Sequence, residues 1–533
     1  MEESSSEEEL PLLRSQASFH LTAPSSPSAE ALAEISIERA KEQRKQQLRN
    51  VISLCGVTLL LGIGVPSQYT TNEVLFTDPV DIRETVFIIH ASLLGSFVLG
   101  GLLLTPLLIA YLGLTYLLLY VSVSVCIYLY LCYIPSLVTL VPSGIAVGQA
   151  LQSSHVSYLI VVAQISHLYL NTHVVSEGQT RQNILHFFSG LFHTFFLAGP
   201  VFRSLIEIVF LQKETNEDKL LDLNDTMICT KLDCSWKADE VLLRGIEYFD
   251  MMLPTFNLHR LQALLGLISI LVVGALFILT LCFKIPFRTE GENVCRTMGL
   301  FVRSSWKVCG TDFLLLIPTM LFIGMEETVV YQVIAKNYLS CRHGWTDKEF
   351  FILCVSGIAT VTCFPLAVLA SYVGRVKSTI AVHLVFVALL FTLCIWTPDW
   401  GDRSVIFAIG SLWGAASALL RVQVPLMLEK VFLHHCISAS SLCVCAMGLG
   451  MLSMVLLQHF MCTQVSFTAC LSVAVISTVT YVVYEIRQAL LAKNGQTGHK
   501  KSELTLPDLD HPSWLPGLDP HETRDRISLF GRP

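Results

Sequence analysis

Three ionisable residues interrupt two apolar segments in the second half of the sequence. Glu326 and Glu327 lie within residues 311–335, and Arg421 lies within residues 404–427. A charge inside lipid is costly, so such side chains usually face a partner or a water-filled cavity. Their chemistry is ion pairing, proton transfer or solute binding. We expect Arg421 to pair with one of the two glutamates, either as a structural ion pair or as part of a substrate or proton site.

A second candidate ion pair lies in the first half of the sequence. Arg203 and Glu207 are four residues apart within residues 184–211, so a helix places them on one face, where a structural pair is the simpler interpretation. Other apolar segments contain histidines, for which we expect hydrogen bonds between helices. These are His90, His155, His167, His186, His193, His383 and His459.

No motif in the sequence indicates catalysis. The histidines and cysteines match no metal-ligand spacing, and there is no phosphate loop, nucleophile elbow or dinucleotide fingerprint. We therefore predict that the protein is not an enzyme and that it requires no cofactor and no metal.

The composition shows which elements position these residues. Of 533 residues, 53% are hydrophobic and 14% charged, and the mean hydropathy is +0.59. An average soluble domain has about 25% charged residues, so a soluble globule, a disordered chain and a nucleic-acid-binding protein are excluded. The apolar blocks are long and continuous, which excludes barrel strands and leaves helices. They lie near residues 51–68, 86–110, 114–133, 138–162, 184–211, 261–283, 311–335, 350–372, 378–396, 404–427, 437–460 and 465–484.

At roughly 20 residues per span, these blocks predict an all-α polytopic membrane protein with about twelve transmembrane helices. Six spans, a basic loop and six more spans are the layout of a major-facilitator fold with two six-helix bundles. Twelve spans without this pairing remain the alternative. The predicted parts are an N-terminal tail (1–50), a first bundle (51–283) with a long loop (212–260), a basic linker (284–310), a second bundle (311–484) and a C-terminal tail (485–533).

The distribution of Lys and Arg predicts the orientation. Basic residues gather before the first span, in the linker 284–310 and after the last span, so both tails, which we expect to be disordered, should be cytosolic. Asn224, the acceptor of an Asn-x-Thr sequon in loop 212–260, then lies on the lumenal or extracellular side and is a predicted glycosylation site. Cys229 and Cys234 in the same loop are either a local disulfide, which we favour, or two free thiols.

The N-terminal tail contains a candidate sorting signal. Residues 8–13 fit an acidic dileucine pattern, in which Leu12 and Leu13 would fill an apolar adaptor pocket and Glu8 would meet a basic patch. This pattern favours an endosomal or lysosomal membrane over the plasma membrane or the endoplasmic reticulum. A chance match in an acidic segment is the alternative.

Several segments, in this order along the chain, resemble the Unc-ninety-three family, a divergent branch of the major facilitator superfamily. The similarity is diffuse over most of residues 45–485. The segments that carry it are residues 48–51, 140–148, 171–173, 187–192 and 411–418, together with His383. Residues 108–114, where many transporters of the superfamily have a charged latch between spans two and three, carry no charge here. Members of the family are best known as accessory proteins of other membrane proteins.

Two functions follow as hypotheses. The first, implied by the resemblance and supported by the missing latch and the dileucine pattern, is a non-enzymatic accessory, regulatory or trafficking subunit of an ion channel or a receptor. The second, supported by the fold and by Glu326, Glu327 and Arg421, is a proton-coupled transporter of a small solute. In both cases the lipid bilayer surrounds the protein, and no nucleic acid is involved.

Overall fold

The computed structural model describes residues 29–64, 79–134, 136–172, 181–210, 258–282, 294–340, 345–396, 403–432, 436–461 and 463–498. The chain divides into two units, Met1–Lys45 and Gln46–Pro533. The contacts described below all lie within the second unit.

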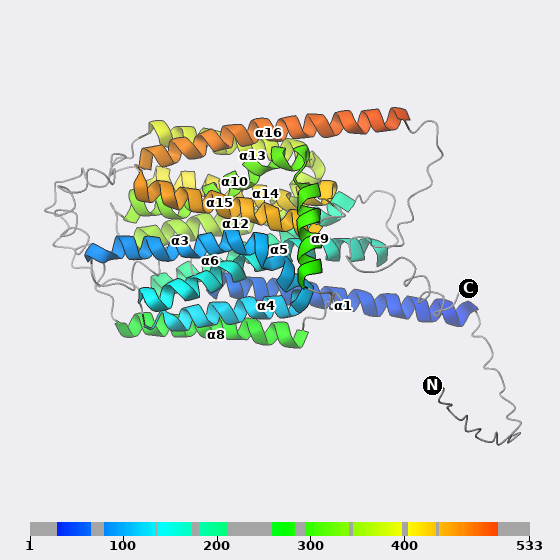
Figure 1. Cartoon of the computed structure of the whole chain (residues 1–533), viewed down its shortest axis with the longest axis horizontal. Helices are drawn as coiled ribbons and strands as arrows, with labels where there is room; N and C mark the ends of the chain where they lie inside the picture. Colours follow the sequence, from blue (N-terminus) through cyan, green and yellow to red (C-terminus); the bar gives the residue numbers. More distant parts are fainter. Residues whose placement is uncertain are drawn as a thin grey trace, which may run out of the picture. The chain divides into compact units, whose positions relative to one another are not determined.

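The described residues form helices, and they contain no strand (Figure 1). The first half comprises α1 (Ala29–Gly64), α3 (Pro79–Leu103), α4 (Thr105–Leu131), α5 (Leu137–Thr172), α6 (Arg181–Phe210) and α8 (Leu258–Cys282). Helix α9 (Val294–Val308) follows. The second half comprises α10 (Thr311–Thr328), the π-helix η3 (Val329–Ser340), α12 (Trp345–Val373), α13 (Arg375–Ile395), α14 (Arg403–Phe432), α15 (Cys436–Phe460) and α16 (Thr463–Gly498).

Within the described residues, nine helices are long and apolar enough to cross a membrane, and three shorter apolar helices accompany them. The shorter ones are Arg49–Ile63, Tyr116–Leu131 and Ala263–Ile278. Together they occupy the apolar blocks of the sequence. The protein is therefore an all-α, multi-pass membrane protein.

Two helices extend beyond the predicted spans. Helix α1 begins at Ala29, before the apolar block at residue 51, and α16 continues to Gly498, beyond residue 484. The added residues are rich in Ala, Glu, Lys, Arg and Gln, which are strong helix formers. Hydropathy predicts where a helix leaves the apolar layer, whereas these residues continue the helix past that point.

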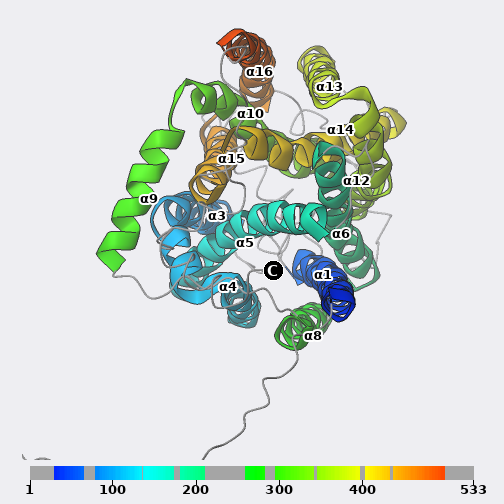
Figure 2. The same ribbon diagram turned by 90° about the vertical axis from the view of Figure 1, so that its right-hand side faces the viewer.

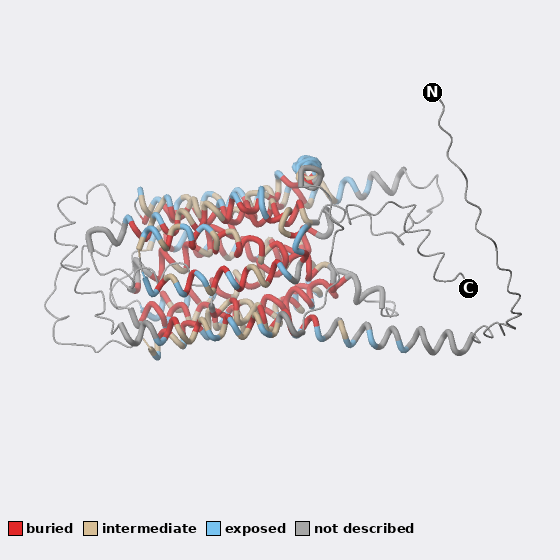
Figure 3. The backbone as a smooth tube through the Cα atoms, turned by 60° about the horizontal axis from the view of Figure 1, so that its bottom comes forward, coloured by how far each residue is buried: buried red, intermediate tan, exposed pale blue. Residues whose placement is uncertain are grey.

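Most long helices run side by side along one direction, and α9 crosses them at one end of the bundle, here called the α9 end (Figure 1). Seen from that end, α9 lies at the edge of the bundle (Figure 2). Buried residues line the inner faces of the helices and exposed ones lie on their outer faces (Figure 3). This pattern suits helices that pack on each other inside and face lipid outside.

Glycines allow close helix crossings within each half. A Cβ on Gly148 of α5 would lie 2.0 Å from the carbonyl oxygen of Leu93 in α3, and one on Gly324 of α10 would lie 1.8 Å from that of Met447 in α15. Neither position tolerates a side chain without separation of the backbones. Small residues at such crossings provide the van der Waals packing that holds membrane helices together.

The two halves have similar short junctions at the α9 end. Gly113 (φ 69°) interrupts α4, and Gly374 (φ 96°) separates α12 from α13; both conformations suit glycine. The residues before them are alike, Tyr111-Leu112 and Tyr372-Val373. Only the second junction continues with a charge, Arg375, which pairs with Glu485 of α16. The junction 108–114, expected between spans two and three, therefore has a charged counterpart in the second half.

Candidate functional site

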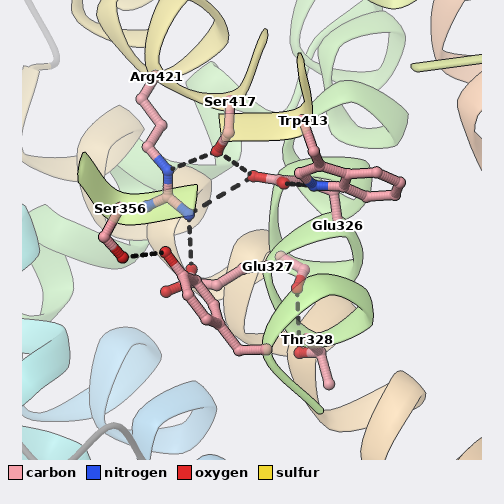
Figure 4. Close-up of polar contacts among 9 residues, drawn as sticks. Glu326, Glu327, Thr328, Ser356, Trp413, Ser417 and Arg421 are labelled. Carbon is pink, nitrogen blue, oxygen red and sulfur yellow. Dashed lines mark hydrogen bonds and ion pairs between the residues drawn. The ribbon is translucent and has the colours of Figure 1, made fainter. Parts of the chain in front are cut away.

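Arg421, Glu326 and Glu327 lie together inside the second half (Figure 4). The Arg421 Nη2 atom is 2.9 Å from Oε2 of Glu327 and 3.5 Å from Oε1 of Glu326. Helix α10 supplies both glutamates and α14 supplies the arginine. With all three ionised, the group carries one net negative charge.

The two glutamates differ in their surroundings. Glu326 is 1% exposed, and its carboxylate accepts hydrogen bonds from Nε1 of Trp413 and Oγ of Ser417, both at 2.8 Å (Figure 4). The Glu327 side chain is 31% exposed, and Arg421 is its partner. Glu326 is therefore buried, with one hydrogen bond to each of its carboxylate oxygens. Glu327 is the more accessible carboxylate of the two.

The backbone changes directly after these residues. From Val329 the helix α10 continues as the π-helix η3, whose hydrogen bonds span five residues rather than four. Tyr331, in its first turn, places its hydroxyl 3.2 Å from Oγ of Ser356 in α12. Departures of this kind are frequent at functional sites. Here the wider turns lie next to the charged group.

Polar residues of the first half approach the same place. His155 of α5 is in electrostatic contact with Glu327 and Arg421, and His193 of α6 with Arg421. The ring of His193 bonds the hydroxyl of Tyr158 at 2.8 Å. Ser189 of α6 donates to the carbonyl of Val422 at 3.1 Å. The charged group therefore lies where the two halves meet.

The pair Arg203–Glu207 belongs to a second charged group between the halves. Nε of Arg203 is 2.7 Å from Oε1 of Glu207, both buried in α6. Lys348 and Glu349 of α12 are 2% and 1% exposed, and Glu349 is in electrostatic contact with Glu207, Lys348 and Arg203. We call these four residues the α6–α12 charge cluster. The sequence did not single out Lys348 and Glu349, because they precede the apolar block that starts at residue 350.

The remaining predicted site residues lie partly outside the described residues and partly at helix contacts. Glu8, Leu12, Leu13, Asn224, Cys229 and Cys234 lie outside the described residues. His383 joins helices: its Nε2 is 2.9 Å from Oγ of Ser477 in α16, which donates to Thr319 of α10. In the part of the chain that the structure describes, no group of three or more His, Cys, Asp or Glu side chains could hold a metal.

The sequence has curated relatives of modest identity. Unc-93 homolog A of Danio rerio is 23% identical over 239 residues, 43% of this chain and 51% of the relative. Unc-93 homolog B1 of Mus musculus is 24% identical over 359 residues, 63% of this chain and 57% of the relative. The putative potassium channel regulatory protein unc-93 of Caenorhabditis elegans is 25% identical over 113 residues, 21% and 16% respectively. The chain spans less than three fifths of the length of each of these relatives. No protein-family model matches it.

Solved structures show the same fold over most of the chain. The Escherichia coli fucose:proton symporter FucP aligns with a TM-score of 0.52 at 12% identity, covering 81% of this chain and 98% of FucP. The human organic anion transporter TETRAN aligns with a TM-score of 0.51 at 13% identity, covering 82% and 99%. At such identity the likeness concerns the fold alone, and that fold is the one of the major facilitator superfamily.

Proposed function

Because the chain is similar in sequence to unc-93 proteins and has the fold of the major facilitator superfamily, we propose that it is a non-catalytic accessory or regulatory subunit of another membrane protein, such as an ion channel or a receptor. The relative from Caenorhabditis elegans, which is named as a potassium channel regulatory protein, supports this class of function. The observation that carries the proposal is that the two halves touch at both ends of the bundle.

The α3–α15 contact is closed at both ends. Away from the α9 end, the rings of Phe87 and His459 stack with their centroids 3.8 Å apart. Towards the α9 end, Ser441 donates to the carbonyl oxygen of Gly101, and the thiol of Cys445 lies 3.6 Å from that of Val98. A transport cycle must break one set of these contacts and then the other, whereas an accessory subunit can keep both.

The α6–α12 contact is also closed at both ends. A Cβ on Gly190 would lie 2.5 Å from Cβ of Ala367, which brings the two backbones close near the α9 end. The α6–α12 charge cluster occupies the opposite end. Separation of the helices there would take Arg203 of α6 away from Glu349, a buried carboxylate of α12. Both contacts favour a scaffold with one stable arrangement.

A proton-coupled solute transporter is the second candidate. It is favoured by the partial exposure of the Glu327 carboxylate beside Arg421, where the two halves meet. Fold similarity to a fucose:proton symporter is compatible with it. Fold alone does not establish function, so the two candidates must be separated by an experiment that restrains the halves.

A disulfide across the halves provides that experiment. Thr194 of α6 and the thiol of Cys363 in α12 both approach the carbonyl oxygen of Gly190, at 2.8 and 3.6 Å. Thr194→Cys should therefore cross-link to Cys363 on oxidation. We expect the cross-linked protein to co-purify from native membranes with the same membrane-protein partner, in the same ratio, as the wild type. Proximity labelling in cells identifies that partner beforehand.

The matched control is Thr194→Cys combined with Cys363→Ala, which cannot cross-link to position 363. The proposal fails if no membrane protein co-purifies in comparable amount. It also fails if reconstituted protein carries a solute-dependent proton flux, measured with a pH-sensitive dye inside vesicles, that oxidation abolishes in Thr194→Cys but not in the control.

Sorting to endosomes or lysosomes is part of the proposal, and it rests on the dileucine pattern. Leu12→Ala with Leu13→Ala should move the protein from endolysosomes towards the plasma membrane, because the adaptor pocket loses both apolar side chains. Leu10→Ala with Leu21→Ala, in the same tail, is the control. Imaging and surface biotinylation measure the distribution. If both double variants remain at the wild-type location, the pattern is a chance match.

The membrane orientation completes the proposal. With both tails in the cytosol, the α9 end is the cytosolic end, and loop 212–260 with Asn224 faces the lumen or the exterior. The charge cluster and the Phe87–His459 stack then close the lumenal or exterior side.

A further inference from the structure

Helix α9 packs one face on the bundle and leaves an apolar strip uncovered. Phe301 and Val308 are 9% and 2% exposed, and α9 contacts α4 and α15. On a neighbouring face, Val302 is 58% and Trp306 84% exposed. A tryptophan is rarely left this open on a protein surface that meets only water.

A basic strip runs beside the apolar one. Val302 and Trp306 are four residues apart, so they lie one turn apart on the same face. Arg303 directly follows Val302 and Lys307 directly follows Trp306, and both basic side chains are also exposed. The uncovered surface of α9 therefore has an apolar edge and a cationic edge about 100° apart around the helix, one on each side of the face opposite Phe301 and Val308. This division is typical of helices that lie in a membrane interface.

The position of α9 fits such an interface. It crosses the spanning helices at their end (Figure 1) and lies at the edge of the bundle (Figure 2), where lipid surrounds a membrane protein. Tryptophan is enriched at the level of the lipid headgroups. The α9 end is the predicted cytosolic end, and the cytosolic leaflet carries anionic lipids that attract Lys and Arg.

We propose that α9 is a lipid-binding helix: Trp306 and Val302 insert between lipid chains near the headgroups, and Arg303 and Lys307 bind the phosphate and carboxylate groups of anionic phospholipids. A lipid surface satisfies both strips at once, since its apolar chains and its anionic headgroups lie in adjacent layers. This site does not depend on the accessory role proposed above.

Lipid retention measures the basic strip. The full chain is reconstituted in nanodiscs of phosphatidylcholine and phosphatidylserine, and the lipids that remain bound are determined by native mass spectrometry. Arg303→Gln with Lys307→Gln should lower the preference for phosphatidylserine by about fivefold for each residue removed. Lys377→Gln with Lys493→Gln removes two exposed basic residues from α13 and α16 and should leave the preference at the wild-type value.

Fluorescence measures the apolar strip. Lipids brominated near the glycerol end of their chains should quench the fluorescence of Trp306. The chain has seven tryptophans. Trp306→Phe should therefore reduce the fraction of the total tryptophan emission that these lipids quench. The proposal is wrong if both double variants keep the same lipid preference. It is also wrong if Trp306→Phe leaves the quenching unchanged, as expected if a protein partner rather than lipid covers the strip.

Discussion

Arg421→Ala should lower the yield of folded protein and its thermal stability more than any other single change in the central charged group. The guanidinium contacts Glu326, which is buried, and Glu327 at 2.9 Å. Removal of one partner from a buried pair typically costs about 3–5 kcal/mol, because the remaining charge stays buried and unpaired. Fluorescence-detected size exclusion after stepwise heating gives the apparent melting temperature.

The two glutamates provide matched controls for this prediction. Glu326→Gln keeps the shape but replaces one of the two accepting oxygens by an amide group, so one of the bonds from Trp413 and Ser417 must rearrange, and the loss should be smaller than for Arg421→Ala. Glu327→Gln should cost least, because that side chain reaches water. Equal stability of Arg421→Ala and wild type, or a larger loss in Glu327→Gln than in Glu326→Gln, would contradict the assignment.

A charge exchange tests the pairing itself. Glu327→Arg combined with Arg421→Glu restores opposite charges at these two positions and should recover part of the yield lost in Arg421→Ala. If the group is structural, the recovered protein keeps its partner. If the group binds a transported solute, the recovered protein folds but has no flux, because the solute meets inverted charges.

Gly324→Ala should be the most disruptive single methyl addition at the contact between α10 and α15. The new Cβ would lie 1.8 Å from the carbonyl oxygen of Met447, and backbone cannot rotate away as a side chain can. The helices must separate, so the loss should reach or exceed the upper end of the about 1–3 kcal/mol usual for overpacking.

Gly357→Ala is the control for this change. Gly357 lies in α12, and a Cβ there meets nothing within 4 Å. An alanine at an open helical position usually stabilises by about 0.4–1 kcal/mol. The melting temperature should therefore fall below the wild-type value in Gly324→Ala and rise above it in Gly357→Ala. A Gly324→Ala protein as stable as Gly357→Ala would show that the α10–α15 crossing is looser than described.

The sequence predicts the architecture well because lipid imposes a simple rule. Backbone polar groups must be bonded within each span, so the long apolar blocks had to be helices. The same rule predicts that charges such as Glu326 and Arg421 need partners, which led to the right pair of helices. It does not predict the ends of α1 and α16, since helix propensity rather than hydropathy extends them.

The rest of the site could not be derived in this way. Trp413 and Ser417 are neutral residues within an apolar block, and their hydrogen bonds to Glu326 depend on how α10 and α14 face each other. Tyr331 reaches Ser356 from a π-helix, for which the sequence contains no signal. At Gly324 the backbone carbonyl of Met447 occupies the place where a side chain would begin. Only the packed structure shows this contact.

The α6–α12 charge cluster also has a consequence for biogenesis. A ribosome completes α6 long before it begins α12, so Arg203 and Glu207 enter the bilayer as a pair before Lys348 and Glu349 have been made. Until Lys348 and Glu349 arrive, the newly made first half presents an ion pair and the bare backbone near Gly190 to the insertion machinery. Chains that stop before α12 would retain this polar face, which is the kind of surface that membrane quality control recognises and degrades.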